Sequence, residues 1–251
     1  MSKNVEVLLR ARKTVELFGP NSTYQESSDQ ESSDVRHPAR VAPIGCAEEA
    51  EMVQRIFMLP TDQVPRVVVF YGVGQVNGAV GVCARAGQNL AKQTNSSVCL
   101  VEGDFHSPAL HQYFAVDNSR GFTDAILESR PIRDFVHSLP GANLSVLCGG
   151  SRCREAQALW KCERLRYSVA ELRREFSYVL ISGPSVSQKQ VDAVLFGQIA
   201  DGSILILESM VTRREVARTA KENLASANVK ILGAVLNNHA FSIPETLYRR
   251  L

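Results

Sequence analysis

The sequence lacks several features that would place it in a common class of proteins. No apolar run reaches the roughly 18 residues that a membrane-spanning helix needs. The 28 Lys and Arg residues nearly balance 26 acidic residues, and the formal charge of +2 gives no electrostatic reason to expect a nucleic-acid partner or attraction of the whole chain to a membrane. The N-terminus has no apolar stretch followed by a small-residue cleavage site, so we do not expect secretion.

Cys-x-x-Cys pairs are also absent, although the chain has six cysteines. Cys83 and Cys99 lie in apolar periodic segments, where they are expected to be small buried hydrophobic residues. A zinc site built from Cys148, Cys153 and Cys162 is a disfavoured alternative. This cysteine usage is typical of a reducing compartment, and it predicts a cytoplasmic protein rather than a disulfide-stabilised secreted one.

A glycine-bearing loop follows the first strongly apolar strand pattern of the chain. Residues 66–81 read as an apolar strand, a loop and the start of a helix, which is the layout of a mononucleotide-binding α/β domain. Glycines allow backbone N–H groups to approach a phosphate, and the N-terminus of the following helix favours an anion. The glycines of this segment are Gly72, Gly74, Gly78 and Gly81.

The same loop lacks the lysine of a working phosphate-binding loop. No Lys occurs between Arg66 and Lys92, whereas a working loop places a Lys on the β- and γ-phosphates and a Ser or Thr on Mg²⁺. Ala79 and Val80 stand at those places. A tight strand-to-helix turn without a ligand therefore stays open as the alternative. The candidate nucleotide-binding residues are Gly74, Asn77, Gly78, Ala79, Val80 and Asn237.

Composition divides the chain into three segments. Residues 1–18 have the apolar spacing of a short amphipathic helix, which is either a surface helix or a docking element for a partner or a membrane. Residues 19–43 are rich in Ser, Gln, Asp, Glu and Pro and repeat a Gln-Glu-Ser-Ser-Asp pentapeptide, which is typical of a flexible linker. Residues 44–251 are expected to form one α/β domain.

Strand and helix patterns alternate from residue 66 onward. Several strand candidates are continuous apolar runs, as expected of parallel strands that are covered on both faces. Such alternation predicts a doubly wound, mostly parallel sheet with helices on both faces, whose ligands bind beyond the carboxyl ends of the strands. The strand candidates are 67–71, 98–102, 144–147, 178–182, 203–208 and 231–236. The helix candidates are 47–59, 78–93, 107–114, 123–128, 132–138, 162–176, 188–199 and 212–227.

Two carboxylates follow the second strand candidate. Glu102 and Asp104 alternate out of its carboxyl end, so they are the catalytic candidates, and Asp104 is a candidate Mg²⁺ ligand. The alternative is a helix-capping Asp104 and a solvated Glu102. His106 and His111 lie just beyond, but their spacing of five residues does not place them on one helical face, so a metal site there is not expected.

The loops after two later strand candidates carry a hydroxyl and an amide. Ser182 stands where an ATPase of this build would place an Asp to organise the water shell of the metal, and a hydroxyl cannot replace that charge. Asn237 follows the last strand candidate, where an amide is able to hydrogen-bond an adenine edge. The first of these positions argues against turnover, and the second favours a nucleotide.

Together these loops resemble the CpsD/CapB family of bacterial tyrosine kinases of exopolysaccharide and capsule assembly, a branch of the MinD/ParA-type P-loop ATPases. The resemblance covers about residues 45–251. It is strongest in residues 100–114, LVEGDFHSPALHQYF, which are similar to the family's LIDADLRRPSLHRLF. Residues 121–126 (GFTDAI) and 176–185 (FSYVLISGPS) are similar to the family's GLTDAL and YDYVIIDTPP.

The resemblance implies a nucleotide site of which only parts are present. Glu102 stands for the first of the family's paired Asp residues, Asp104 matches the second, and Asn237 matches its base-contacting Asn. The family's lysine, its Asp at position 182 and its tyrosine-rich tail are missing. Tyr248 is the one tyrosine near the end of the chain, and it is the candidate phospho-acceptor.

Three functional hypotheses follow. The first is a degenerate homologue that regulates or scaffolds polysaccharide production by binding a membrane-embedded copolymerase or chain-length protein from the cytoplasmic side. The second is an active tyrosine autokinase or ATPase in which Arg85, Arg213 or Arg214 supplies the missing charge, although Arg85 lies almost two turns into its helix and is expected to be too far from the loop to replace the lysine easily. The third is a switch that binds ATP or ADP, with Mg²⁺, without hydrolysis. A homo-oligomer is an open alternative, because Glu49 and Arg55 keep two of three positions of the family's E-x2-R-x2-R oligomerisation motif.

Overall fold

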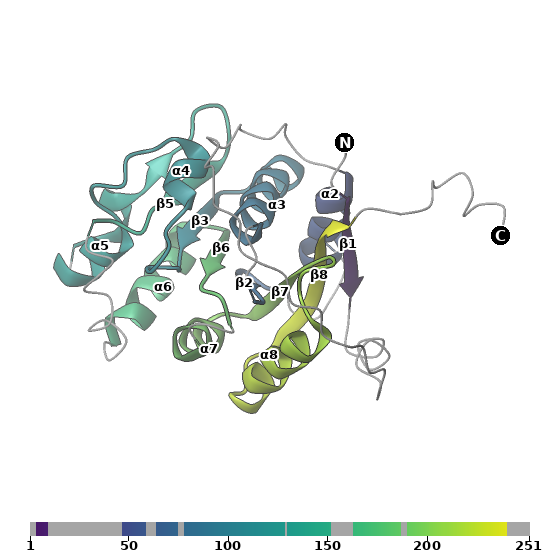
Figure 1. Ribbon diagram of the computed structural model, residues 1–251. Coiled ribbons are helices and arrows are strands. Elements are labelled where there is room, and N and C mark those ends of the chain that lie inside the picture. Colours follow the sequence, from purple (N-terminus) through teal and green to yellow (C-terminus); the bar gives the residue numbers. More distant parts are fainter. Residues whose placement is uncertain are drawn as a thin grey trace, which may run out of the picture.

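The computed structural model describes residues 4–9, 47–58, 64–74, 78–128, 130–151, 163–186 and 190–239. Within these residues one sheet has the strand order β1-β8-β7-β2-β6-β3-β5-β4 (Figure 1). The strands from β8 to β5 run parallel, and the edge strands β1 and β4 are antiparallel to their neighbours. Their bounds are β1 (Asn4–Leu9), β2 (Val67–Gly72), β3 (Val98–Glu102), β4 (His137–Ser138), β5 (Leu144–Leu147), β6 (Tyr178–Gly183), β7 (Gly202–Glu208) and β8 (Ile231–His239).

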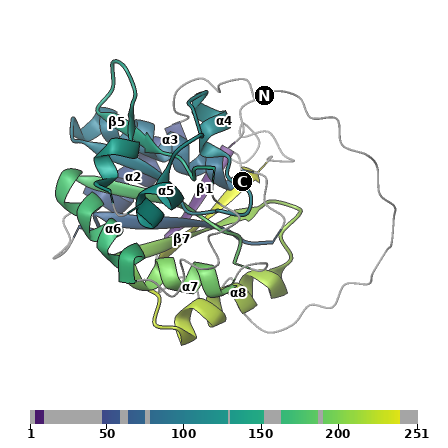
Figure 2. The same ribbon diagram turned by 90° about the vertical axis from the view of Figure 1, so that its left-hand side faces the viewer.

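Helices lie on both faces of this sheet (Figures 1 and 2). One layer contains α2 (Ala47–Val53), which a π-helical turn continues over Gln54–Met58, together with α3 (Ala79–Thr94) and α4 (Leu110–Phe114). The other layer contains α5 (Phe122–Glu128), α6 (Glu163–Glu175), α7 (Gln190–Ile199) and α8 (Arg214–Ser226). The predicted doubly wound, mostly parallel α/β fold is therefore confirmed.

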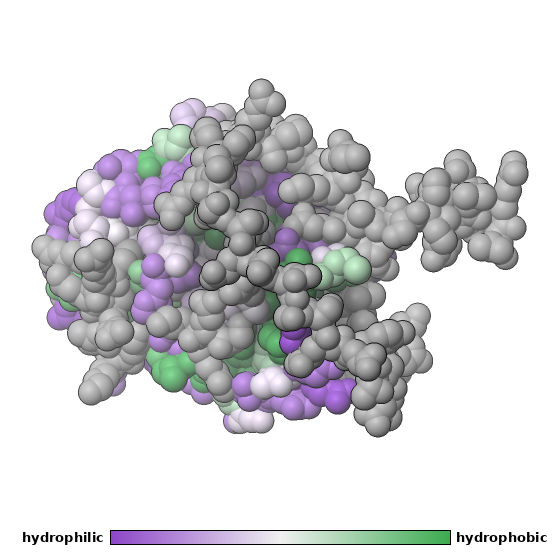
Figure 3. All heavy atoms as spheres, in the orientation of Figure 1, coloured by the Kyte–Doolittle hydropathy of each residue, from purple (hydrophilic) through white to green (hydrophobic). Residues whose placement is uncertain are grey.

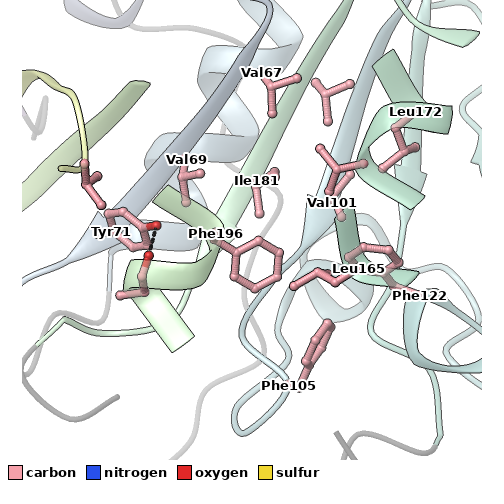
Figure 4. Close-up of a cluster of buried hydrophobic side chains, with 14 of the residues drawn as sticks. Val67, Val69, Tyr71, Val101, Phe105, Phe122, Leu165, Leu172, Ile181 and Phe196 are labelled. Carbon is pink, nitrogen blue, oxygen red and sulfur yellow. Dashed lines mark hydrogen bonds between the residues drawn. The ribbon is translucent and has the colours of Figure 1, made fainter. Parts of the chain in front are cut away.

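Successive residues of the central strands face opposite layers. In β2, Val67, Val69 and Tyr71 pack toward α6 and α7, whereas Val68 and Phe70 pack toward α2 and α3, and all five are fully buried. Burial on both faces explains why the strand reads as a continuous apolar run. Figure 4 shows the first of these clusters, in which the Tyr71 hydroxyl donates a hydrogen bond of 2.5 Å to a carbonyl oxygen of α7.

The prediction of an N-terminal helix over residues 1–18 was wrong for residues 4–9. These residues form β1, which pairs antiparallel with β8 and so belongs to the α/β domain. The short segment Val5-Glu6-Val7 also alternates with the period of a strand, and β-branched residues favour that conformation. Residues 10–18 and the predicted linker 19–43 lie outside the described residues.

The predicted helix over residues 132–138 was also wrong. A single 3-10 turn, η2, covers Ile132–Phe135, and Val136 then turns to an extended backbone. The next two residues form β4, which pairs with β5 at the edge of the sheet. A β-branched residue after such a short turn loses little by leaving the helical conformation, and pairing with β5 satisfies backbone groups that a short helix leaves unpaired.

At the amino end of β2, one carboxylate fixes the start of the strand. Asp201 accepts 2.8 Å hydrogen bonds from the backbone N–H groups of Arg66 and Val67 and from the Arg173 guanidinium. Burial opposes ionisation, but these hydrogen bonds outweigh it and lower the pKa of Asp201. The Arg66 guanidinium also donates to three carbonyl oxygens at and just after the end of α6. The charged side chains of this group are thus all held by hydrogen bonds, and Arg173 and Asp201 form an ion pair.

Candidate nucleotide-binding site

The loop after β2 is held to the neighbouring loop after β6. Gly74 has a φ of +82°, a left-handed conformation that favours glycine. Its carbonyl oxygen accepts a hydrogen bond of 3.0 Å from the Ser185 hydroxyl, and the Gly72 carbonyl accepts one of 3.0 Å from the Val186 N–H. The predicted loop therefore lies at the carboxyl edge of the sheet. Asn77 lies outside the described residues.

The residue at the start of the next helix has no side chain to cap it. Gly78 is the residue before α3, so the N-cap position supplies no hydrogen bond to the first turn. Ala79 and Val80 follow in that turn, half-buried, so the aliphatic side chains stand where the sequence predicted a missing Lys and Ser/Thr. If Gly81 rather than Gly78 is taken as the last glycine of the loop, the Lys and the Ser/Thr are still missing, because the next two residues, Val82 and Cys83, are buried hydrophobic side chains.

Asn237 and Gly78 meet although they are far apart in the sequence. Asn237 lies near the end of β8 with 3% of its surface exposed. A Cβ atom built on Gly78 would lie 2.1 Å from Asn237 Nδ2, so only glycine fits there without displacing the amide. The amide that was predicted to contact a base is packed against the loop.

Glu102 is a helix cap rather than a solvated carboxylate. Its Oε2 accepts hydrogen bonds of 2.7 and 2.8 Å from the N–H groups of Ala109 and Leu110 at the start of α4, and its Oε1 accepts one of 3.3 Å from Asp104 N–H. The side chain is fully buried. Burial raises the pKa of Glu102 to about 7, against the lowering effect of these hydrogen bonds. The alternative of a solvated Glu102 was wrong.

Asp104 closes the turn that follows β3. Its Oδ1 accepts hydrogen bonds of 3.0 and 3.1 Å from the N–H groups of His106 and Ser107. Three of the four carboxylate oxygens of Glu102 and Asp104 therefore accept amide hydrogen bonds. Mg²⁺ is a hard cation that takes oxygen ligands in near-octahedral geometry, and the pair of carboxylates is a poor fit to it.

A histidine that was not expected to bind metal joins this turn to α7. His106 Nε2 lies 3.1 Å from Asp192 Oδ2, and Asp192 is 7% exposed. Asp192 had no predicted role, because nothing in the sequence places it beside a loop that precedes it by more than eighty residues. Among the described residues, no group of three or more His, Cys, Asp or Glu side chains is able to hold a metal ion. The Cys148–Cys153–Cys162 alternative lies partly outside the described residues.

Ser182 lies near the end of β6, the strand between β2 and β3, whose following loops carry the other candidate residues. It is 1% exposed and is aligned with Glu102 of β3 and with Phe70 of β2. Its carbonyl oxygen accepts a hydrogen bond of 2.8 Å from Gly103 N–H. Position 182 therefore lies where an ATPase of this fold would carry a carboxylate that organises the metal, but this chain has the neutral hydroxyl of Ser182 there.

Arg85 reaches the first turn of α3, contrary to the expectation from its place in the helix. A Cβ atom on Gly81 would lie 3.0 Å from Arg85 Nη1, because long side chains on a helix point back toward its N-terminus. The guanidinium is nevertheless engaged, since its Nε donates a 2.5 Å hydrogen bond to Oε1 of the fully buried Glu49 in α2. The other two candidate cations, Arg213 and Arg214, are exposed at the start of α8.

Comparison with known proteins confirms the predicted resemblance. No protein-family model matches the chain. Over 150 residues it is 29% identical to the tyrosine-protein kinase YwqD of Bacillus subtilis, covering 60% of this chain and 63% of the relative. It is 24% identical over 145 residues to the putative tyrosine-protein kinase CapB of Staphylococcus aureus, covering 58% and 63% of the two chains. The chain therefore spans less than two thirds of the length of these relatives.

Solved structures agree with the fold. The chimerical protein CapA2B2 superposes with a TM-score of 0.72 at 21% identity, over 78% of this chain and 85% of that one. The septum site-determining protein MinD from Pyrococcus horikoshii, complexed with Mg-ADP, gives a TM-score of 0.57 at 18% identity over 67% and 68% of the two chains. The sheet and helix layers thus match those of MinD-like P-loop proteins.

Proposed function

We propose that this chain is a kinase-like regulatory or scaffolding component of exopolysaccharide or capsule biosynthesis that works by binding, with little or no ATP turnover. The observation that carries the proposal is the use of Glu102 and Asp104 to hold backbone amides. Ser182 adds no charge, and Arg85 is paired with Glu49. Losing one group that stabilises transition-state charge costs about two to three powers of ten in rate, so several such losses leave little turnover.

The proposed partner is a membrane-embedded polysaccharide copolymerase or chain-length protein, bound from the cytoplasmic side. The likeness to CapA2B2 and the resemblance to CpsD/CapB-type kinases support this class of partner. None of the described helices is long and apolar enough to cross a bilayer. A homo-oligomer is a weaker proposal, because Glu49 pairs with Arg85 and Arg55 pairs with Glu51 within the same chain.

A nucleotide-sensing switch is the second candidate. The glycine loop after β2 leads into α3 through Gly78, which has no side chain to cap the helix, and the N-terminus of a helix with uncapped N–H groups favours an anion such as a phosphate. ATP or ADP is the ligand that this geometry supports, with Mg²⁺ contributing little. Calorimetric titration with ADP distinguishes the two candidate functions. A saturable heat of binding supports the nucleotide-sensing switch, whereas no heat at millimolar ADP supports the scaffolding function without a nucleotide.

The test of the first proposal is a radiolabel assay with purified full chain and Mg-ATP. The matched control is Asp104→Asn, which removes the charge of the one carboxylate that retains an oxygen without an amide partner. We expect phosphate release and tyrosine phosphate at the level of the control. Turnover well above that of Asp104→Asn would contradict the proposal and favour an active kinase. Loss of the tyrosine phosphate in Tyr248→Phe would then identify Tyr248 as the acceptor.

A further inference from the structure

The loop between β7 and α8 carries two exposed apolar side chains. Met210 is 101% exposed, so no other residue covers its side chain, and Val211 is 55% exposed. The loop follows the carboxyl end of β7 and therefore lies at the same end of the sheet as the candidate nucleotide site. A single exposed hydrophobic residue is ordinary on a protein surface, so the meaning of this pair depends on how it is held.

Hydrogen bonds hold this loop in one conformation. The N–H and carbonyl of Glu208 bond to the hydroxyl and N–H of Thr212, both at 2.9 Å. The Thr212 hydroxyl also donates to the Val73 carbonyl at 3.3 Å, and Ser209 N–H donates to the Asn237 carbonyl at 2.9 Å. The loop is thus tied to the residue that follows β2 and to β8. We call Met210 and Val211, held in this way, the apolar tip.

The backbone of the tip is strained at the exposed methionine. Met210 has a φ of +64°, in the left-handed region that glycine adopts freely and that side chains with a Cβ rarely adopt. Asn95, Ala115 and Asn228 share this conformation, but among the described residues only Met210 combines it with a large apolar side chain, which supports a role for that side chain. Met210 contributes nothing to the core, so the role is one at the surface.

The residues after the tip are mainly basic. Arg213, Arg214, Arg218 and Lys221 lie in or next to the first two turns of α8, against two acids, Glu215 and Glu222. Figure 3 shows mostly hydrophilic residues over this helix. A cluster of basic side chains beside an apolar insertion is the pattern by which proteins bind anionic lipid surfaces, although the net charge of the whole chain is only +2.

We propose that the apolar tip inserts into the interface of an anionic lipid bilayer while the arginines at the start of α8 lie over the lipid headgroups. A protruding side chain that nothing covers suits a bilayer, which closes around it, whereas a protein partner would have to supply a pocket. The charge of α8 matches an anionic surface. The inference goes beyond the proposed function, because it concerns lipid rather than nucleotide or a protein partner.

The test is flotation of the purified full chain with vesicles. One set contains phosphatidylglycerol and phosphatidylcholine in equal amounts, and the other contains phosphatidylcholine alone. We expect binding to the anionic vesicles that weakens with added salt, and little binding to the neutral ones. Met210→Gly removes the apolar side chain and the strain together. It should weaken binding about tenfold while the melting temperature stays equal to or above that of the wild type.

Two further variants complete the design. Arg213→Gln should weaken binding about fivefold. Val64→Gly, at an exposed apolar residue before the amino end of β2, is the matched control and should bind like the wild type. Equal binding to both vesicle types, or full binding by Met210→Gly, overturns the proposal. So does the absence of vesicle binding together with Met210-dependent capture by the cytoplasmic segment of a membrane protein. None of these readouts depends on nucleotide.

Discussion

The two ends of the sheet use carboxylates in opposite ways. At the amino end, Asp201 is ionised, and backbone and guanidinium hydrogen bonds lower its pKa. At the carboxyl end, Glu102 is fully buried with a pKa raised to about 7. The first carboxylate is ionised and paired, whereas the second has been withdrawn from the edge where a ligand would bind. This contrast between the two ends supports the proposal that the chain works by binding rather than by catalysis.

Truncating the amino-end carboxylate is expected to have the largest effect. Asp201→Ala removes three hydrogen bonds, one of them to Arg173, and leaves the N–H groups that begin β2 without their partner. We expect the free energy of unfolding to fall by about 3 kcal/mol, measured by urea denaturation. Asp134→Ala is the matched control, because its pair with Arg130 is exposed and is worth under about 1 kcal/mol. Equal losses in the two variants would refute the role of Asp201.

The two carboxylates should also respond to pH with opposite signs. The pKa of Glu102 is raised on folding, so its contribution is complete below the unfolded value near 4.5 and is lost as pH rises through about 7. The pKa of Asp201 is lowered, so its contribution is present above its unfolded value of about 3.9 and is lost as pH falls through its folded value.

A non-titrating variant isolates the Glu102 term. Glu102→Gln should gain stability relative to the wild type as pH rises from about 5 to 8. The gain approaches about 3 kcal/mol, since each pKa unit is worth about 1.4 kcal/mol. Thermal or urea melts of both proteins across this range measure it. A difference that does not change with pH would show that Glu102 is already ionised in the folded protein, and that the contrast between the two ends is false.

A smaller effect is expected where Asn237 meets the loop. Gly78→Ala places a Cβ atom 2.1 Å from Asn237 Nδ2, and overpacking of this kind costs about 1–2 kcal/mol. Asn237→Ala removes the obstructing amide, so Gly78→Ala should cost less in that background. A double-mutant cycle of unfolding free energies measures the coupling. Purely additive losses would mean that the two residues do not contact each other.

The sequence predicted the fold well because its strands are buried on both faces and its loops carry several independent motifs. It placed Glu102 and Asp104 at the correct end of the correct strand. It could not predict that Glu102 turns onto the amides of α4, because that contact depends on the path of residues 103–109. The sequence also did not predict that the guanidinium of Arg85 reaches back to the first turn of α3, since the rise along a helix says nothing of where a long side chain points.

The N-terminal error has a different cause. Over residues 4–9 the same apolar side chains fit a helical spacing and a strand alternation, and only pairing with β8 decides between them. Propensity within six residues is too weak to predict this pairing, whereas the long central helices carry enough periods to be assigned from sequence alone.

The most direct measurement of the central claim is a pair of calorimetric titrations of the full chain with ATP, one with Mg²⁺ and one with EDTA. If the residues at the carboxyl end of the sheet do not bind Mg²⁺, ATP binds with the same affinity in both titrations, and Asp104→Asn leaves both affinities unchanged. The opposite result would be wild-type binding that Mg²⁺ tightens tenfold or more, with this effect of Mg²⁺ lost in Asp104→Asn. It would contradict the account and favour the alternative of an active kinase.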